Sequence, residues 1–342
     1  MPARTQIRVK KRATSGRTRN ITLTNVLLAI IIIVLVGYIF YPAIKQYLYG
    51  GPFGNRLVNI DKPLSASQLG VINNAPNSYF ETAAEMLLNN SIPGEQVSNN
   101  IYSAADFEAM LSRGTLENAY VIGGKPSVIY IGAISCIYCG ESRWAMALAL
   151  SRFGNFSELY LGYSSIGDGD VPTLYWNKDN IVSDNVTYGN KYTSPYINFI
   201  SAEYDSNISQ GFQLPNINDP IQYYINNAPN ATYRDAMSYM NNTGAFQGTP
   251  FTLWGDSLDV GAAAVVFGVP NAQSSSSQKP QITYMTHAQI LNQLSKFNST
   301  LAIEEYVGAD IYSAQICAAI NNTASVCKLP AILAFESKMG LQ

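Results

Sequence analysis

The sequence has few charged side chains, and it contains a single histidine. Of its 342 residues, 13% are Asp, Glu, Lys or Arg, and the one histidine is His287. The chain also lacks a phosphate loop, a nucleophile elbow, a dinucleotide-binding turn and an H-E-x-x-H helix. These absences argue against the common nucleotide-binding, serine-hydrolase and metalloprotease chemistries. We interpret His287, near the start of a late helix, as a surface or capping residue rather than a catalytic base.

Acidic residues are absent from the first 19 positions, which carry seven basic residues. The rest of the chain has 14 basic against 23 acidic residues, and 47% of all residues are hydrophobic, enough to form a core. A basic arm is compatible with nucleic-acid binding, but the residues that follow favour a membrane. We therefore expect the lipid bilayer, and no nucleic acid, as a partner.

The residues after the basic arm form an uncharged apolar run, positions 23–41, of the roughly 20 residues needed to cross a bilayer. Basic residues before the run and few after it predict an N-terminus in the cytoplasm and an extracellular C-terminal part. A cleaved signal peptide is the alternative, but its apolar region is usually shorter and no A-x-A site follows. We expect a basic cytoplasmic tail at 1–20 and a transmembrane helix at 21–41.

The remainder is expected to comprise a juxtamembrane linker at 42–75 and one exterior domain at 76–342. Within that domain, residues 177–245 are polar and rich in Tyr and Asn, and we interpret them as a mostly helical insertion. The patterns predict helices at 77–90, 103–113, 196–204, 219–227, 233–240, 286–297 and within 301–321, and strands at 128–133, 159–163, 173–176 and in a hairpin over 251–269.

Two sequence features agree with an exterior location. Four cysteines, an even number, follow the apolar run. Eight Asn-x-Ser/Thr sequons follow it as well, and they are glycosylation candidates: Asn89, Asn155, Asn185, Asn207, Asn230, Asn241, Asn298 and Asn321. Asn20, which lies before the apolar run, should remain unmodified.

The most informative stretch is the Cys-x-x-Cys sequence at Cys136 and Cys139. It follows a short apolar β-branched run, residues 128–133, and precedes about four turns of helix-forming residues. Backbone N–H groups and the dipole at a helix start stabilise a thiolate, so this placement favours reactive cysteines. A second stretch, Thr249-Pro250 entering an apolar run, is typical of a strand start and allows a cis or a trans proline.

The order of strand, Cys-x-x-Cys helix, insertion, Thr-Pro, hairpin and C-terminal helix resembles the thioredoxin-like superfamily. Residues 125–327 are also similar to an uncharacterised archaeal family of membrane-anchored proteins from acid-loving thermophiles. The resemblance implies an α/β thioredoxin-like core with a helical insertion, preceded by one transmembrane helix. It further implies Cys136 as the attacking thiolate, Cys139 as the resolving thiol and Pro250 as a substrate-facing cis proline. Tyr138 and Thr249 would border the substrate, and no cofactor is implied.

The other cysteines, Cys317 and Cys327, are ten positions apart, and we expect a structural disulfide between them. A four-cysteine zinc site is the rival interpretation, but this spacing and an oxidising exterior oppose it, so no metal is expected. Asp168 and Asp170 suit a loop better than a calcium site.

Two functions remain open from the sequence. One is a membrane-anchored thiol–disulfide oxidoreductase, or disulfide-handling factor, acting on cysteine-containing secreted or envelope proteins. The other is a non-catalytic envelope domain that binds envelope or protein partners, in which Cys136–Cys139 is a permanent disulfide.

Overall fold

The computed structural model describes residues 60–89, 91, 116, 118–164, 171–178, 185–205, 220–244, 246, 248–260, 282 and 285–341, which form a mixed α/β fold. The expected basic tail, transmembrane helix, helix at 103–113 and first part of the linker lie outside these residues. Among the described residues, no helix is both long enough and apolar enough to cross a bilayer.

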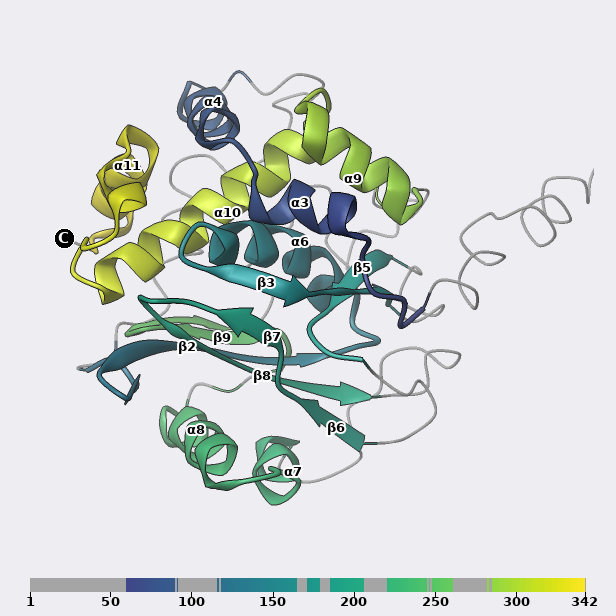
Figure 1. Cartoon of the computed structure of the whole chain (residues 1–342). Coiled ribbons are helices and arrows are strands. Elements are labelled where there is room, and N and C mark those ends of the chain that lie inside the picture. Colours follow the sequence, from purple (N-terminus) through teal and green to yellow (C-terminus); the bar gives the residue numbers. More distant parts are fainter. Residues whose placement is uncertain are drawn as a thin grey trace, which may run out of the picture.

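One mixed β-sheet forms the centre of the molecule (Figure 1). Its strand order is β10-β9-β2-β8-β6, and β1 pairs with the start of β2. The β2–β8 pair is parallel and all the others are antiparallel. The strands are β1 (Val121–Ile122), β2 (Lys125–Ala133), β6 (Asn185–Tyr188), β8 (Asn198–Asp205), β9 (Phe251–Trp254) and β10 (Ser257–Val260).

The parallel pairing of β2 with β8 requires a crossover connection, which begins with helix α6 (Ile137–Ser151). Between α6 and β8 the chain also forms two small antiparallel ladders, β3–β7 and β4–β5. Their strands are β3 (Asn155–Glu158), β4 (Tyr160–Tyr163), β5 (Pro172–Tyr175) and β7 (Lys191–Thr193). The expected strands at 159–163 and 173–176 correspond to β4 and β5.

Helices cover both faces of the central sheet, so alternate residues of β2 enter two different cores. Val128 and Tyr130 belong to the larger core, and Ile129 and Ile131 to the smaller one. The larger core contains α3 (Ala66–Asn73), α4 (Asn77–Leu88), α6, α9 (His287–Lys296), α10 (Thr300–Ala319) and α11 (Pro330–Met339). The smaller core contains α7 (Pro220–Asn226) and α8 (Ala231–Asn242), drawn below the sheet in Figure 1.

The expected linker is wrong for residues 60–75, which are part of the folded domain. Ser65 starts α3 with a capping box, because its hydroxyl accepts from the Gln68 N–H while the Gln68 side chain accepts from the Ser65 N–H. Ile72 is fully buried, and Pro63 forms a β-bridge with Tyr160. The segment has few apolar residues, but two of them, Leu64 and Ile72, are buried in the larger core.

The expected mostly helical insertion is wrong for residues 185–205, which contain three strands. The helical pattern at 196–204 overlaps β8, a strand in the interior of the central sheet. The apolar residues of this short run fit the helical period and the strand period equally well. Its seven residue pairs with β2, from Ser127↔Asn198 to Ala133↔Tyr204, make it a strand. The helical part of the insertion is confined to α7 and α8 among the described residues.

The second hairpin strand also begins earlier than expected. Strand β10 starts at Ser257, directly after the Gly255-Asp256 turn, and Ser257 pairs with Trp254. Gly255 has a φ of 69°, and a Cβ on it would lie 2.0 Å from the Ala319 Cβ of α10. The turn therefore needs glycine both for its backbone conformation and for its close approach to α10. The expected strand at 262–269 lies outside the described residues.

The C-terminal helices are joined by the predicted disulfide between Cys317 of α10 and Cys327. Their Cα atoms are 5.4 Å apart, and both side chains are fully buried. Cys327 lies in the short 3-10 helix η2 (Ser325–Lys328), which leads into α11. The bond therefore fixes the α10–α11 connection.

We predict that Cys317→Ala/Cys327→Ala lowers the stability of the chain by about 2–3 kcal/mol, because the unfolded state loses a loop constraint. Thermal unfolding should show a Tm lower by roughly 5–10 °C. Ser325→Ala, at an exposed position inside the same loop, is the control and should leave Tm nearly unchanged. Equal Tm values for the double variant and the wild type would contradict a stabilising role.

Candidate functional site

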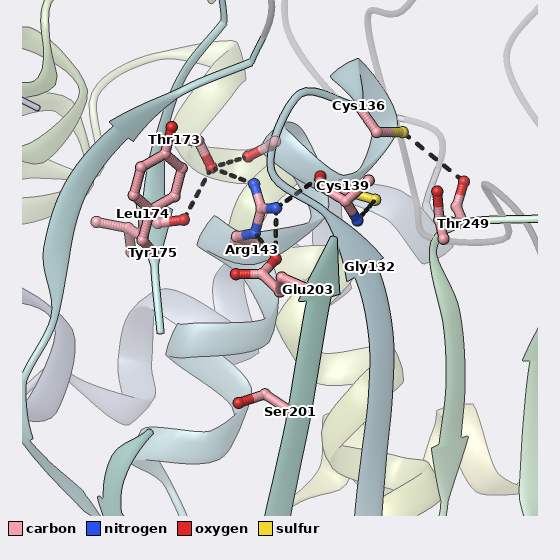
Figure 2. Close-up of polar contacts among 12 residues, drawn as sticks. Gly132, Cys136, Cys139, Arg143, Thr173, Leu174, Tyr175, Ser201, Glu203 and Thr249 are labelled. Carbon is pink, nitrogen blue, oxygen red and sulfur yellow. Dashed lines mark hydrogen bonds and ion pairs between the residues drawn. The ribbon is translucent and has the colours of Figure 1, made fainter. Parts of the chain in front are cut away.

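The Cys-x-x-Cys cysteines lie where β2 ends and α6 begins (Figure 2). Cys136 is the N-cap residue of α6, with extended backbone angles and no capping hydrogen bond from its side chain. Cys139 follows in the first turn of the helix. The local sequence explains this placement, because an apolar strand ends at Ala133 and helix-forming residues follow after a short turn.

Both cysteines are free thiols and both are buried. Cys136 is 3% exposed and Cys139 is 0% exposed. The Ala133 backbone N–H donates to Cys139 Sγ at 3.4 Å, and Cys136 Sγ donates to the Thr249 carbonyl oxygen at 3.7 Å. The two sulfurs are therefore held between the end of β2 and the residue before Pro250.

The Thr249–Pro250 peptide bond is cis and directly precedes β9. Because β9 pairs with β2, the bond lies beside the start of α6, and Figure 2 shows Thr249 facing Cys136. This cis bond next to Cys136 is the arrangement implied by the resemblance. Thr249 is 9% exposed, and its hydroxyl oxygen has no hydrogen-bond partner within the described part of the chain.

A buried ion pair lies one turn beyond Cys139. Arg143 donates from Nε and Nη2 to Glu203 Oε1 at 2.7 and 2.5 Å, and both side chains are almost completely buried. The same guanidinium donates to the Ala133 carbonyl at 2.9 Å and to Thr173 Oγ1 at 3.5 Å. Arg143 thus connects α6 with β2, β5 and β8, and its guanidinium lies beside Cys139 (Figure 2).

The surroundings shift the pKa values of the two cysteines in opposite directions. Burial raises the pKa of Cys139, but the hydrogen bond with Cys136 and the charge of Arg143 outweigh it and leave this pKa below its usual value. The hydrogen bond with Cys139, followed by burial, raises the pKa of Cys136 well above its usual value. In the reduced pair, the hydrogen bond with Cys139 and burial therefore affect the Cys136 pKa more strongly than the helix start, which was expected to stabilise a Cys136 thiolate.

Three aromatic residues lie on the strand and helix that carry the cysteines: Tyr130, Tyr138 and Trp144. Tyr138 is half-buried and packs against both cores, and Trp144 is fully buried with its Nε1–H bonded to the Pro172 carbonyl at 3.0 Å. Tyr130 is fully buried, and burial raises its pKa well above the usual value. Trp144 therefore belongs to the core, whereas Tyr138 is the aromatic residue of the Cys-x-x-Cys turn.

Residues 115–318 match a family model described as a domain of unknown function, DUF929. The chain belongs to this family. No curated protein and no solved structure matches the chain. The DUF929 region contains both thiols, Thr249, Pro250 and the Arg143 network, and it ends inside α10 just after Cys317.

His287 is not the surface residue expected from the sequence. It lies immediately after the α9 N-cap, but it is only 3% exposed, and its Nε2 is bonded to the Gly162 and Thr173 carbonyls at 2.7 and 3.0 Å. Burial lowers its pKa to about 4. Because these partners lie on β4 and β5, His287 joins α9 to the small β4–β5 ladder.

Most of the predicted sequons lie among the residues that the structure describes. Exposed sequon asparagines are Asn89, Asn155, Asn230, Asn298 and Asn321; Asn241 is half-buried, Asn185 begins β6, and Asn207 lies outside the described residues.

The disulfide between Cys317 and Cys327 excludes a zinc site that uses all four cysteines. No group of three potential metal ligands occurs within the residues that the structure describes, and Asp168 and Asp170 are not among those residues.

Sequence reasoning missed the Arg143–Glu203 pair. Arg143 lies four positions after Cys139, and this helical spacing is a signal that could have placed it near the thiols. No local signal identifies Glu203, which is 60 positions further along the chain and was assigned to a helix.

We predict that Arg143→Met/Glu203→Leu raises the pKa of Cys139 and so lowers the fraction of thiolate at a given pH, because the cation that lowers this pKa is removed. Replacing both partners avoids leaving one buried charge unpaired. The thiolate fraction is measured by ultraviolet absorbance, and by the rate of alkylation, as functions of pH.

The matched control is Arg152→Met/Asp310→Leu, which removes the other buried ion pair of α6, between α6 and α10. This control should leave the thiol titration unchanged. Identical titration curves for all three proteins would show that Arg143 does not set the charge of the cysteine pair.

Proposed function

We propose that this chain is a thioredoxin-like thiol–disulfide oxidoreductase that acts outside the cell on cysteine-containing secreted or envelope proteins. The fold is compatible with this proposal. A Cys-x-x-Cys sequence at the start of the helix in a β-α-β unit is typical of thioredoxin-like redox proteins. Here β2, α6 and β8 form that unit, and the antiparallel strands β9 and β10 complete one side of the sheet.

The observation that carries the proposal is the position of Cys136 next to Thr249. Cys136 Sγ lies 3.7 Å from the Thr249 carbonyl oxygen, at the N-terminus of α6, and both cysteines are thiols. A structural disulfide between Cys136 and Cys139 would constrain very little of the unfolded chain, so stability alone accounts poorly for this pair.

The proposed reaction moves two electrons between the cysteine pair and a client disulfide. Cys136 gives its proton to the neighbouring Cys139 thiolate and attacks one client sulfur. The client S–S bond breaks, the other client sulfur leaves as a thiolate, and a mixed disulfide forms. Cys139 then attacks Cys136 Sγ, and its proton goes to the departing client thiolate. The client is reduced and Cys136–Cys139 is oxidised. The reverse sequence oxidises a client dithiol, and a second dithiol or disulfide protein restores the starting state.

Arg143 contributes to both steps through its charge. It favours the thiolate form of Cys139, which accepts the Cys136 proton in the first step, and it favours loss of that proton when Cys139 attacks the mixed disulfide. Thr249 would bind the client backbone through its carbonyl group once Cys136 is engaged, and Tyr138 would contact the client beside the Cys-x-x-Cys turn.

Burial of the thiols favours a second candidate, a non-catalytic envelope domain. Cys136 is 3% exposed and Cys139 is 0% exposed, so a protein client needs a local opening to reach either sulfur. In this alternative the pair would oxidise once and remain a permanent disulfide.

We predict that Cys139→Ser traps a mixed disulfide with a peptide that contains one intramolecular disulfide, because the resolving thiol is missing. The adduct, on Cys136, is measured by intact mass. Cys136→Ser is the matched control and should form less than about a tenth of this adduct, since the remaining thiol is the more buried one.

The same experiment separates the two candidates. Wild-type protein should also catalyse insulin reduction by a small thiol, and Cys136→Ser should not. Absence of the mixed disulfide, together with a Cys136–Cys139 reduction potential below about −300 mV, would favour the permanent disulfide.

We also propose that residues 21–41 anchor the chain in the cell membrane, with residues 1–20 in the cytoplasm and the folded domain outside. The supporting observations are the charge asymmetry and the exposure of sequon asparagines such as Asn155.

In a glycosylating host, Asn155→Gln should remove one glycan from the full chain, because this exposed asparagine faces the modifying compartment. The measurement is the gel mobility before and after deglycosylation. Asn20→Gln, on the other side of the apolar run, is the control and should change nothing. A loss of glycan only in Asn20→Gln would reverse the proposed orientation.

A further inference from the structure

Helix α6, which carries both thiols, packs along α10 (Figure 1). Most side chains of α10 are buried, and so is α6 from Cys139 to Leu150. Charged groups in such a contact are costly unless they are paired or neutral. The described residues place two kinds of carboxyl group at this contact, one paired with a cation and one not.

The unpaired group consists of Glu141 on α6 and Glu305 on α10. Glu141 is 6% exposed and Glu305 is 9% exposed. Neither carboxyl oxygen of Glu141 has a hydrogen-bond partner within the described residues. Glu305 is close enough for its charge to act on Glu141, and it also interacts with the Ala145 backbone, one turn further along α6. The two carboxyl groups thus share one small buried region.

The basic groups buried near α6 are engaged elsewhere. Arg143 is bonded to Glu203 on β8, and Arg152 is bonded to Asp310 on α10. His287 of α9 is bonded to two backbone carbonyls of the β4–β5 ladder. None of these groups acts on Glu141 or Glu305 in the described part of the chain.

Tyr312, another buried residue of α10, is close enough to Glu305 for its charge to act on the tyrosine. Its pKa is raised well above the usual value, chiefly by burial, so it stays neutral through the physiological range. The carboxyl pair therefore faces a neutral phenol and each other, and its surroundings supply no positive charge from the described residues.

We propose that Glu141 and Glu305 form a proton-dependent latch between α6 and α10. While both carboxyl groups are protonated they are neutral and the helices stay packed. Ionisation places negative charge in this contact without a counter-charge, and it loosens the helix that carries the cysteines. The proposal concerns the fold and does not require the exchange reaction.

The direction of the pH dependence follows from burial. Burial, followed by the charge of Glu305, raises the pKa of Glu141 well above its usual value, and burial raises the pKa of Glu305 from 4.5 to about 8. The unfolded chain ionises near pH 4.5, whereas folded Glu305 keeps its proton until about pH 8. The stabilising effect is therefore complete below pH 4.5 and is lost as the pH rises to about 8.

The test is thermal unfolding of the full chain, in detergent, between pH 4 and pH 8. The Glu141→Gln/Glu305→Gln variant keeps the shape but cannot ionise, and between pH 4 and pH 8 the Tm of the wild type should fall by at least about 5 °C relative to that of this variant. The comparison cancels the opposite contribution of His287, whose lowered pKa favours the folded chain as the pH rises. Glu85→Gln, at an exposed position of α4, is the control and should behave as wild type.

The same pH dependence of Tm in the wild type and in the double variant would overturn the latch. Should the double variant not fold, each single Gln variant is measured in the same way and should show part of the effect. Cys136→Ser must retain the wild-type pH dependence, which separates failure of the latch from failure of the proposed redox function.

Discussion

The ion pair between Arg143 and Glu203 connects the elements on which the candidate site depends. It joins α6 to β8, and the same guanidinium holds the Ala133 carbonyl at the end of β2. Both charges lie out of water, so separating them would leave an uncompensated charge in the interior, at a cost of about 3–5 kcal/mol. The start of α6 is therefore held in one position over the sheet. This fixed position of α6 sets where the two sulfurs lie, and it keeps them close enough to Arg143 for its charge to act on both.

The local features of the site could be predicted from the sequence because their signals are local. An apolar run ending in Cys136 and Cys139 indicated a strand followed by a helix, and Thr249-Pro250 indicated a strand start. What could not be predicted depends on distant partners. Strand β8 has a pattern that suits either a helix or a strand, and its pairing with β2 decides. Glu203 becomes part of the site only through that pairing.

Burial of polar residues was the other source of error. The sequence interpretation placed His287 at the surface or at a helix cap, but His287 begins the apolar face of α9 that Ile290, Leu291 and Leu294 continue at helical spacing. Two backbone carbonyls bind it in the interior. Glu141 and Glu305 illustrate the same point for carboxyl groups. Asp310, with Arg152 beside it, is a conventional buried ion pair, whereas Glu141 has no cation among its described neighbours. Composition alone does not distinguish the two cases.

The disulfide between Cys317 and Cys327 has a topological consequence for the chain's C-terminal end. The DUF929 region stops at residue 318, so the bond crosses that boundary and links α10 covalently to the segment that leads into α11. A peptide-bond cleavage between the two cysteines would therefore not release α11. In an oxidising medium the two fragments would remain a single covalent molecule, and a nick would become visible only after the sulfur–sulfur link is reduced.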